Sequence, residues 1–226
     1  ALCRKTARAI VSRPSVRVRI SAERLRRWLG PPRIPDAGRD SNPPPGLAQG
    51  LAWTPEGGDI LTIEVATMPG QGRRILTGLL GDVMKESAET AVSLVRARAE
   101  AWDLPADFAE HHDLHIHVPA GAVPKDGPSA GLAIAVALVS LLRRQPVPAD
   151  CAMTGEITLR GRVLPVGGIR EKVLAAARGG LRRVILPAAN RDDLVEVPRE
   201  VRRQLTVLRV RNIEEALAAI FGDGRT

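Results

Sequence analysis

From residue 47 onward, the hydrophobic and polar positions of this chain follow two different periods. Alternation of apolar and polar residues is typical of a half-buried strand, and apolar residues every three or four positions are typical of an amphipathic helix. The pattern predicts strands at 51–53, 59–68, 113–118 and 182–187, a hairpin within 152–168 with Gly161 in its turn, and helices at 78–102, 169–178 and 213–221. Interleaved strands and helices predict an α/β (α+β) domain in which helices cover one sheet.

The segment 125–142, KDGPSAGLAIAVALVSLL, predicts a buried helix that begins in a Gly-Pro-Ser-Ala-Gly turn. In one interpretation Ser129 simply caps that helix. In the other, Ser129 is a nucleophile, and the backbone amides of the Gly127–Ser129 turn stabilise an oxyanion at the positive end of the helix. Gly127 and Gly131 would permit a tight turn and the close approach of a substrate. The local pattern leaves both interpretations open.

A nucleophilic serine needs a base, and two residue types are candidates. The histidines all lie in HHDLHIH, where His115 and His117 share a predicted strand face with Asp113. That face fits the lining of a cleft, or less simply a zinc site, since no HExxH motif or cysteine cluster completes a ligand set. The alternative base is Lys172, which lies on the flank of the apolar stripe of helix 169–178. Lys172 either extends its amine to water, or it is buried and loses basicity.

The first 46 residues have a different character. Residues 1–30 predict a helix, a short strand at 16–20, and a second helix with Ser21 as N-cap and Gly30 as C-cap. Residues 31–46 are rich in Pro, Gly, Asp and Ser and predict a linker. The predicted organisation is therefore 1–30, 31–46 and 47–226.

Charge and composition narrow the functional classes. The chain of 226 residues has a formal net charge of +8, but residues 1–35 alone contribute +9 and the remainder is close to neutral. The basicity is thus a property of the leading segment, which contacts DNA, is a solvated face, or contacts a neighbour absent from this chain. No apolar run reaches the ~18 residues of a membrane span. Two cysteines favour a reducing, cytoplasmic setting, and the absence of an initiator Met suggests a piece of a longer protein.

Several long motifs together resemble the proteolytic domain of the Lon proteases. They are GLAWTPEGGDILTIE, GLLGDVMKES, PKDGPSAG and AMTGEITLRGRVLPVGGIREKVLAAARGG, in that order. The resemblance extends from about Gly46 to the C-terminal helix, and the PKDGPSAG form is similar to the A-type, ATP-dependent bacterial branch. Residues 1–30 resemble the end of the helical subdomain of an AAA+ module, which precedes the protease in this family.

The resemblance implies a role for seven residues. Ser129 would be the nucleophile, Lys172 the general base, and Thr154 the residue that hydrogen-bonds and orients the lysine. Asp126 and Glu64 match acidic residues near the active site. His115 and His117 match histidines that lie close to the site without belonging to the dyad.

The resemblance also implies partners and a cellular setting. We expect an ATP-dependent serine endopeptidase of the cytoplasm that degrades damaged and regulatory polypeptides as a hexameric ring. The sequence contains no Gly-Lys dipeptide and so no phosphate-binding Walker A loop. We therefore expect no cofactor or metal in this chain, and ATP with Mg²⁺ only in an AAA+ module of a longer protein. A catalytically silent assembly domain and a DNA-binding module are the alternatives.

Overall fold

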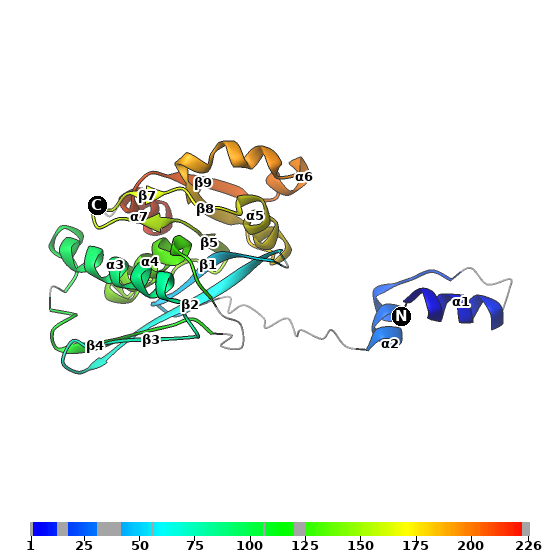
Figure 1. Ribbon diagram of the computed structural model, residues 1–226, viewed down its shortest axis with the longest axis horizontal. Helices are drawn as coiled ribbons and strands as arrows, with labels where there is room; N and C mark the ends of the chain where they lie inside the picture. Colours follow the sequence, from blue (N-terminus) through cyan, green and yellow to red (C-terminus); the bar gives the residue numbers. More distant parts are fainter. Residues whose placement is uncertain are drawn as a thin grey trace. The chain divides into compact units, whose positions relative to one another are not determined.

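The computed structural model describes residues 2–12, 18–30, 42–55, 57–105, 107–119 and 125–222. The chain divides into two compact units, residues 1–39 and 40–226. Figure 1 shows the elements of both units. Most of the predicted linker, residues 31–41, lies outside the described residues.

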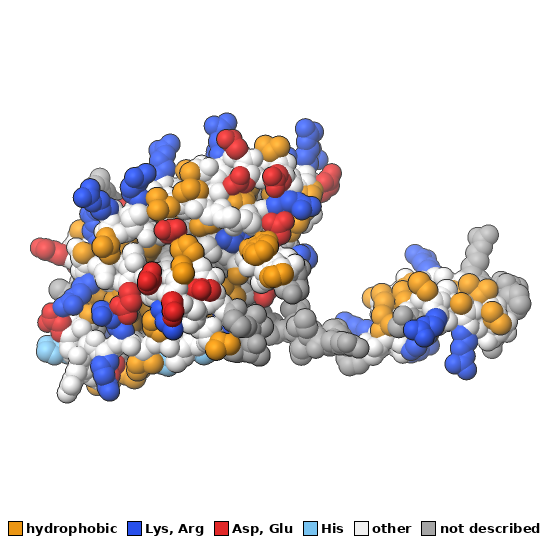
Figure 2. Space-filling view, viewed as in Figure 1, with side chains coloured by type: hydrophobic (Ala, Val, Ile, Leu, Met, Phe, Trp, Pro, Cys, Tyr) orange, Lys and Arg blue, Asp and Glu red, His pale blue; other side chains and the backbone are white. Residues whose placement is uncertain are grey.

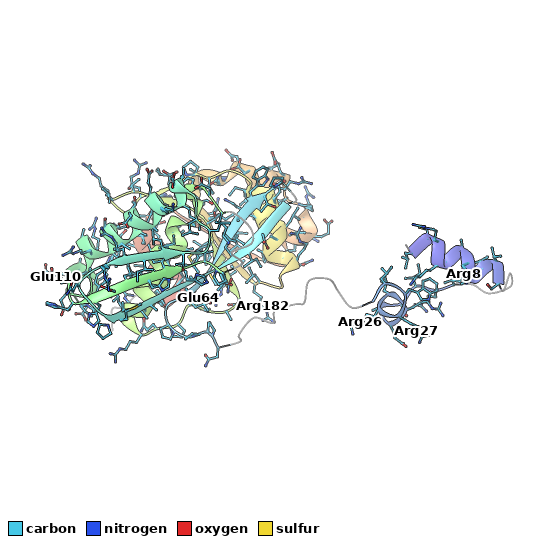
Figure 3. All side chains as sticks on the ribbon, turned by 60° about the horizontal axis from the view of Figure 1, so that its bottom comes forward. Arg8, Arg26, Arg27, Glu64, Glu110 and Arg182 are labelled. Carbon is cyan, nitrogen blue, oxygen red and sulfur yellow. The ribbon has the colours of Figure 1, made fainter. Side chains whose placement is uncertain are left out.

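The first unit contains helices α1 (Leu2–Ser12) and α2 (Ala22–Leu29). The predicted caps of α2 are confirmed, because Ser21 Oγ accepts a hydrogen bond from the Arg24 amide at 3.2 Å and Gly30 adopts a φ of 86°. The predicted strand is wrong for residues 18–20, which have no regular structure, and residues 16 and 17 lie outside the described part. Neither helix buries a residue. Figure 3 shows Arg8, Arg26 and Arg27 on these helices. On the face of this unit drawn in Figure 2, basic side chains lie beside hydrophobic side chains.

In the second unit, seven strands of the described chain form one mixed sheet in the order β3-β4-β2-β1-β5-β8-β9. Their bounds are β1 Leu47–Thr54, β2 Gly57–Pro69, β3 Arg74–Thr77, β4 His112–His117, β5 Cys151–Met153, β8 Arg183–Pro187 and β9 Thr206–Val210. The β1–β2 and β2–β4 pairs are antiparallel, and the remaining pairs are parallel. A separate hairpin joins β6 (Glu156–Ile157) to β7 (Val163–Leu164), with Gly161 in its turn at a φ of 80°.

The helices of this unit are α3 Asp82–Arg98, α4 Gly131–Arg143, α5 Ile169–Arg178, α6 Arg199–Arg202 and α7 Ile213–Phe221. Short 3₁₀ turns lie at η1 Glu100–Trp102, η2 Pro128–Ala130, η3 Ala188–Asn190 and η4 Asp192–Glu196. The predicted bounds of α5 and α7 are confirmed. The helix predicted at 78–102 is shorter, because Gly78 and Leu79 have positive φ angles and Ala99 already departs toward η1. The pattern missed β3 and β9, which are only four and five residues long.

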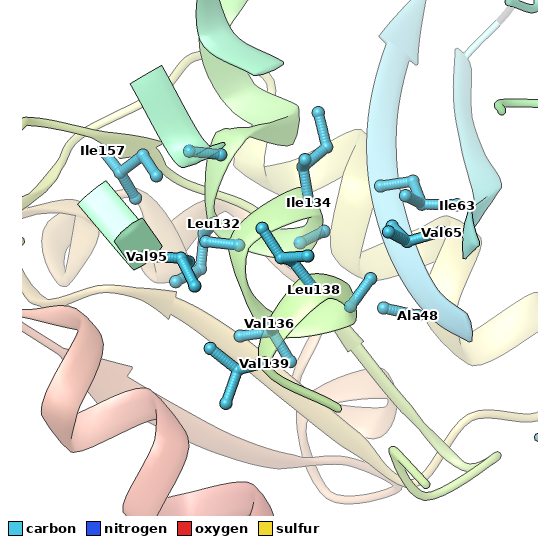
Figure 4. Packing of buried hydrophobic residues seen from close by; sticks show 14 of the residues in the cluster. Ala48, Ile63, Val65, Val95, Leu132, Ile134, Val136, Leu138, Val139 and Ile157 are labelled. Carbon is cyan, nitrogen blue, oxygen red and sulfur yellow. The ribbon is translucent and has the colours of Figure 1, made fainter. Parts of the chain in front are cut away.

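The two faces of the sheet are covered by different helices. Ile185 of β8 belongs to the core that contains α3, α4 and α7, whereas its neighbours Val184 and Leu186 belong to the core beneath α5. This alternation follows from the period of two in a strand. Figure 4 shows α4 side chains packed between those of β1 and β2 and Val95 of α3. Ser129 lies in the turn η2 that leads into α4, and Lys172 lies on α5, so the two come from opposite faces of the sheet.

Candidate active site

Ser129 lies in the 3₁₀ turn η2, which leads directly into α4. Among the residues that the structure describes, no side-chain hydrogen bond caps η2 or α4, so the interpretation of Ser129 as a helix cap is wrong. The half-buried serine lines a cavity of about 660 Å³, and Lys172 and Asp126 line the same cavity. We call this space the Ser129 cavity. The turn thus presents a hydroxyl at the boundary between the core and an open pocket.

The backbone around Ser129 is held from two sides. The Ser87 hydroxyl of α3 donates to the Pro128 carbonyl at 3.1 Å. The Ser129 carbonyl accepts from the Gly155 amide at 2.9 Å and from Thr154 Oγ1 at 3.2 Å. Because these contacts satisfy the polar groups on both sides of the serine, its backbone position is defined by packed elements rather than by the turn alone.

Asp126 caps helix α3 although the two are far apart in the sequence. Its Oδ1 accepts from the Met84 amide at 3.0 Å, which is the third amide of the helix, and from the Gly127 amide at 2.9 Å. A Cβ at Gly81 would overlap this carboxylate, so a glycine is needed at the helix start. The contact also changes the expected oxyanion donors. Since the Gly127 amide is engaged and Pro128 has none, Ser129 supplies the remaining backbone N–H of that turn.

Lys172 lies in the first turn of α5 and is only 2% exposed, so it does not extend to water. Its Nζ donates to Thr154 Oγ1 at 3.1 Å. Removal of the amine from water lowers the pKa of Lys172 to about 8, because burial disfavours the charged form. The buried amine therefore loses its proton more readily than an exposed lysine does.

Thr154 directly follows β5 at the end of the sheet. Its hydrogen bonds connect the turn η2, which precedes α4, with helix α5. Its hydroxyl accepts from Lys172 Nζ and donates to the Ser129 carbonyl. Thr154 is completely buried, which excludes water from both bonds. Among the described residues there is no direct hydrogen bond between Ser129 Oγ and Lys172 Nζ, so Thr154 is the side chain that links them.

Glu64, His115 and His117 line a second cavity of about 490 Å³, which we call the histidine cavity. Glu64 lies on β2, as labelled in Figure 3. On this strand Thr62 lines the Ser129 cavity, whereas Glu64 lines the histidine cavity. Thr77 Oγ1 forms hydrogen bonds with His115 Nε2 at 2.8 Å and His117 Nδ1 at 2.7 Å. The structure therefore places these three residues beside the Ser129 cavity rather than within it, and their contribution to the site stays a prediction.

Asp113 does not join the histidines. Its carboxylate accepts from the amides of Gln71 and Arg73 and from the Arg73 guanidinium at 2.8–3.0 Å, which anchors the turn before β3. The part of the chain that the structure describes contains no group of three metal-ligating side chains. The Asp-x-His-x-His residues, considered above as the less simple zinc alternative, are thus divided between two local networks.

The sequence did not predict a role for Lys125, which lines the Ser129 cavity, or for Ser87, which contacts the turn that contains Ser129. Lys125 is buried, lines the cavity and donates to the Gly78 carbonyl at 3.0 Å, and burial lowers its pKa. Ser87 holds the Pro128 carbonyl. Both belong to motifs quoted above, PKDGPSAG and GLLGDVMKES, and that membership is the signal that could have identified them.

A serine at the start of a buried helix and a lysine of lowered pKa in the same cavity are the parts that a serine-lysine hydrolase needs. Residues 19–222 match the family model of the Lon protease (S16) C-terminal proteolytic domain. The chain therefore belongs to the Lon protease family and is a protease domain of that family.

Individual relatives agree with the family match. The chain is 55% identical over 216 residues to the Lon protease of Heliobacterium modesticaldum, covering 96% of this chain and 27% of that protein. It is 56% identical over 202 residues to the Lon protease of Phenylobacterium zucineum, covering 89% and 26%. Lon protease 1 of Thermus thermophilus is 52% identical over 217 residues, covering 96% and 27%. The chain thus spans about a quarter of the length of the curated relatives it matches.

None of the helices in the described residues is long and apolar enough to cross a membrane.

Proposed function

We propose that this domain is a serine endopeptidase in which Ser129 is the nucleophile and Lys172 the general base. Neutral Lys172 takes the hydroxyl proton as Ser129 Oγ attacks the scissile carbonyl, which forms a tetrahedral oxyanion. The lysine then gives that proton to the leaving amine as the peptide bond breaks. A water, deprotonated by the same lysine, hydrolyses the acyl-enzyme and restores the hydroxyl.

The observation that carries the proposal is the buried Lys172 amine, bonded to Thr154, in the same cavity as Ser129. A neutral amine has two N–H donors and one lone pair. One N–H is directed to Thr154 Oγ1, so the lone pair stays available for the serine proton. The Ser129 amide is the proposed oxyanion donor from the turn, assisted by the positive end of α4.

The test uses three variants and an unstructured peptide substrate. Ser129→Ala is expected to abolish peptide hydrolysis and covalent labelling by a serine-directed acylating inhibitor. Lys172→Arg is expected to be inactive, because a guanidinium stays protonated and cannot act as a base. Lys85→Arg is the matched control, since Lys85 is exposed and pairs with Asp82 on the surface of α3. An active Lys172→Arg variant would overturn the dyad.

The pH profile tests the same base in the unmodified protein. Because only neutral Lys172 can accept the proton, kcat/KM is expected to rise with pH through a midpoint near 8, the pKa of the buried amine. Measurement of peptide hydrolysis between pH 6 and 10 checks this. A profile that is flat across that range contradicts a lysine base.

The wider activity of the longer proteins is also a proposal for this chain. By family, we infer ATP-dependent degradation of damaged and regulatory proteins by a hexameric ring in the cytoplasm, with ATP and Mg²⁺ bound outside this chain. This sequence contains no Walker A loop, and the proposed catalytic steps use no nucleotide. If the chain is instead a catalytically silent assembly domain, it should form the expected oligomers but hydrolyse no peptide. A DNA-binding module predicts salt-sensitive binding that survives Ser129→Ala and requires residues 1–35.

A further inference from the structure

The loop between β7 and α5, residues 165–168, forms part of the wall of the Ser129 cavity. It ends in Gly167 and Gly168, and Gly168 adopts a φ of 70° as the N-cap of α5 without any side-chain cap. The Lys172 amide donates to the Gly168 carbonyl at 3.0 Å, one helical turn later. The place where this loop ends therefore decides where the backbone of Lys172 lies.

Two consecutive glycines give this loop much conformational freedom, so other contacts must define its path. The backbone of Val166 is held by the side chain of Asn190, from η3 after β8. Asn190 Oδ1 accepts from the Val166 amide at 3.0 Å, and Asn190 Nδ2 donates to the Val166 carbonyl at 2.9 Å. One side-chain amide thus satisfies both polar groups of one residue, as a neighbouring strand would.

The orientation of the Asn190 amide is itself fixed. Its second Nδ2 hydrogen is directed to Asp193 Oδ2 at 2.5 Å, so a reversed amide would place two oxygens in contact. Asn190 is 5% exposed, and Val166 packs against the core beneath α5. Loss of the paired contact would leave the polar groups of half-buried Val166 without their partner, which is costly.

We propose that Asn190 is a positioning residue for catalysis, which holds the 165–168 loop so that Lys172 reaches Thr154 and the loop completes the wall of the Ser129 cavity. This inference rests on the proposed function. Asn190 touches neither Ser129 nor Lys172 through any contact described, and it acts through the backbone of Val166.

Asn190→Asp tests the clamp with almost no change of shape. The carboxylate can still accept from the Val166 amide, but it cannot donate to the Val166 carbonyl, and it lies beside the Asp193 carboxylate. Asp193→Asn is the matched control, because its amide oxygen can still accept from Asn190 Nδ2. The double variant removes the repulsion between carboxylates while the Val166 carbonyl stays without its donor.

We expect Asn190→Asp to lower kcat/KM for an unstructured peptide by about 10- to 100-fold, as small displacements of catalytic groups do. Asp193→Asn should stay within about twofold of the wild type, and the double variant should stay at least about tenfold below it. In a ¹³C NMR titration of labelled lysines, the midpoint of Lys172 should rise by about one unit in Asn190→Asp, because a loosened loop admits water.

Three outcomes would overturn the positioning role. The first is a kcat/KM of Asn190→Asp equal to that of the wild type. The second is full recovery of kcat/KM in the double variant. The third is an Asn190→Asp variant with a lower thermal midpoint but an unchanged kcat/KM and an unchanged Lys172 titration. Failure of the proposed function looks different. In that case the wild-type protein neither hydrolyses peptide nor labels at Ser129, and the Lys172 titration still shows whether Asn190 controls the environment of that amine.

Discussion

Lys172 is a buried amine whose partner is a hydroxyl and not a carboxylate. A carboxylate would stabilise the ammonium and keep its pKa high, whereas a neutral partner in a dry place leaves the neutral amine favoured. The folded protein therefore carries an unfavourable charge at any pH well below 8. This cost in stability accompanies the neutral amine that the proposed mechanism needs.

The cost makes stability depend on pH. The pKa of Lys172 is about 8 when folded and near 10.5 in an unfolded chain. Between these values the unfolded chain binds more protons, so the contribution of Lys172 to stability rises with pH over that window. Lys172→Met should exceed the wild type in free energy of unfolding by about 1–3 kcal/mol at pH 7. That difference should shrink as pH rises from 8 to 10.

Urea unfolding at several pH values measures this difference. Lys85→Met, a change at an exposed lysine, is the control and should show no comparable dependence on pH. The account of the buried amine is contradicted if Lys172→Met is less stable than the wild type at pH 7. It is also contradicted if the free energies of unfolding of the variant and the wild type differ by the same amount at pH 7 and pH 10.

Thr154 joins the lysine to the backbone of the serine, and both of its bonds come from one hydroxyl. Thr154→Val keeps the shape and removes both bonds. We expect it to lower the free energy of unfolding by about 1–2 kcal/mol and kcat by about 10- to 100-fold. Thr154→Ser, which keeps the hydroxyl, should retain kcat within a few-fold. Equal kcat for the two variants would show that the hydroxyl is not needed.

At the scale of elements, α3 begins where Asp126 supplies the acceptor that its own N-cap, Gly81, lacks. Asp126→Ala should lower the free energy of unfolding by about 1 kcal/mol, the usual cost of losing an N-cap. Asp126→Asn should change it little, since an amide oxygen still accepts from the Met84 amide. Chemical unfolding of both variants tests the cap, and an undestabilised Asp126→Ala would refute it.

The pattern of the sequence predicted long or strongly periodic elements well. Helices 169–178 and 213–221 were placed to the residue because the apolar stripe and the flanking glycines agree. The strands β3 and β9 were missed because four or five residues hold too little periodicity. The start of α3 was misplaced because the apolar spacing continues through Leu79, whereas the positive φ angles there forbid a helix.

At the scale of the whole molecule, the chain consists of two compact units, and the proposed site lies wholly within residues 40–226. Such a unit has its own core and is expected to fold alone. A chain of residues 40–226 should therefore keep the thermal midpoint of the longer chain within about 2 °C, and its peptide hydrolysis should be unchanged. Calorimetry and a peptidase assay test this, and loss of a cooperative transition would contradict it.

The sequence by itself determined the α/β class, the buried helix after Ser129 and the stripe beside Lys172, since these follow from local periodicity and turn residues. It also carried motifs long enough to indicate the family. Only the tertiary structure decided that Ser129 caps no helix, that Lys172 is buried, and that Glu64 and the histidines line a neighbouring cavity. The reason is physical: exposure, pKa and hydrogen-bond partners depend on which distant segments meet. The hydrogen bonds of Thr154 and Asn190 are contacts with such segments.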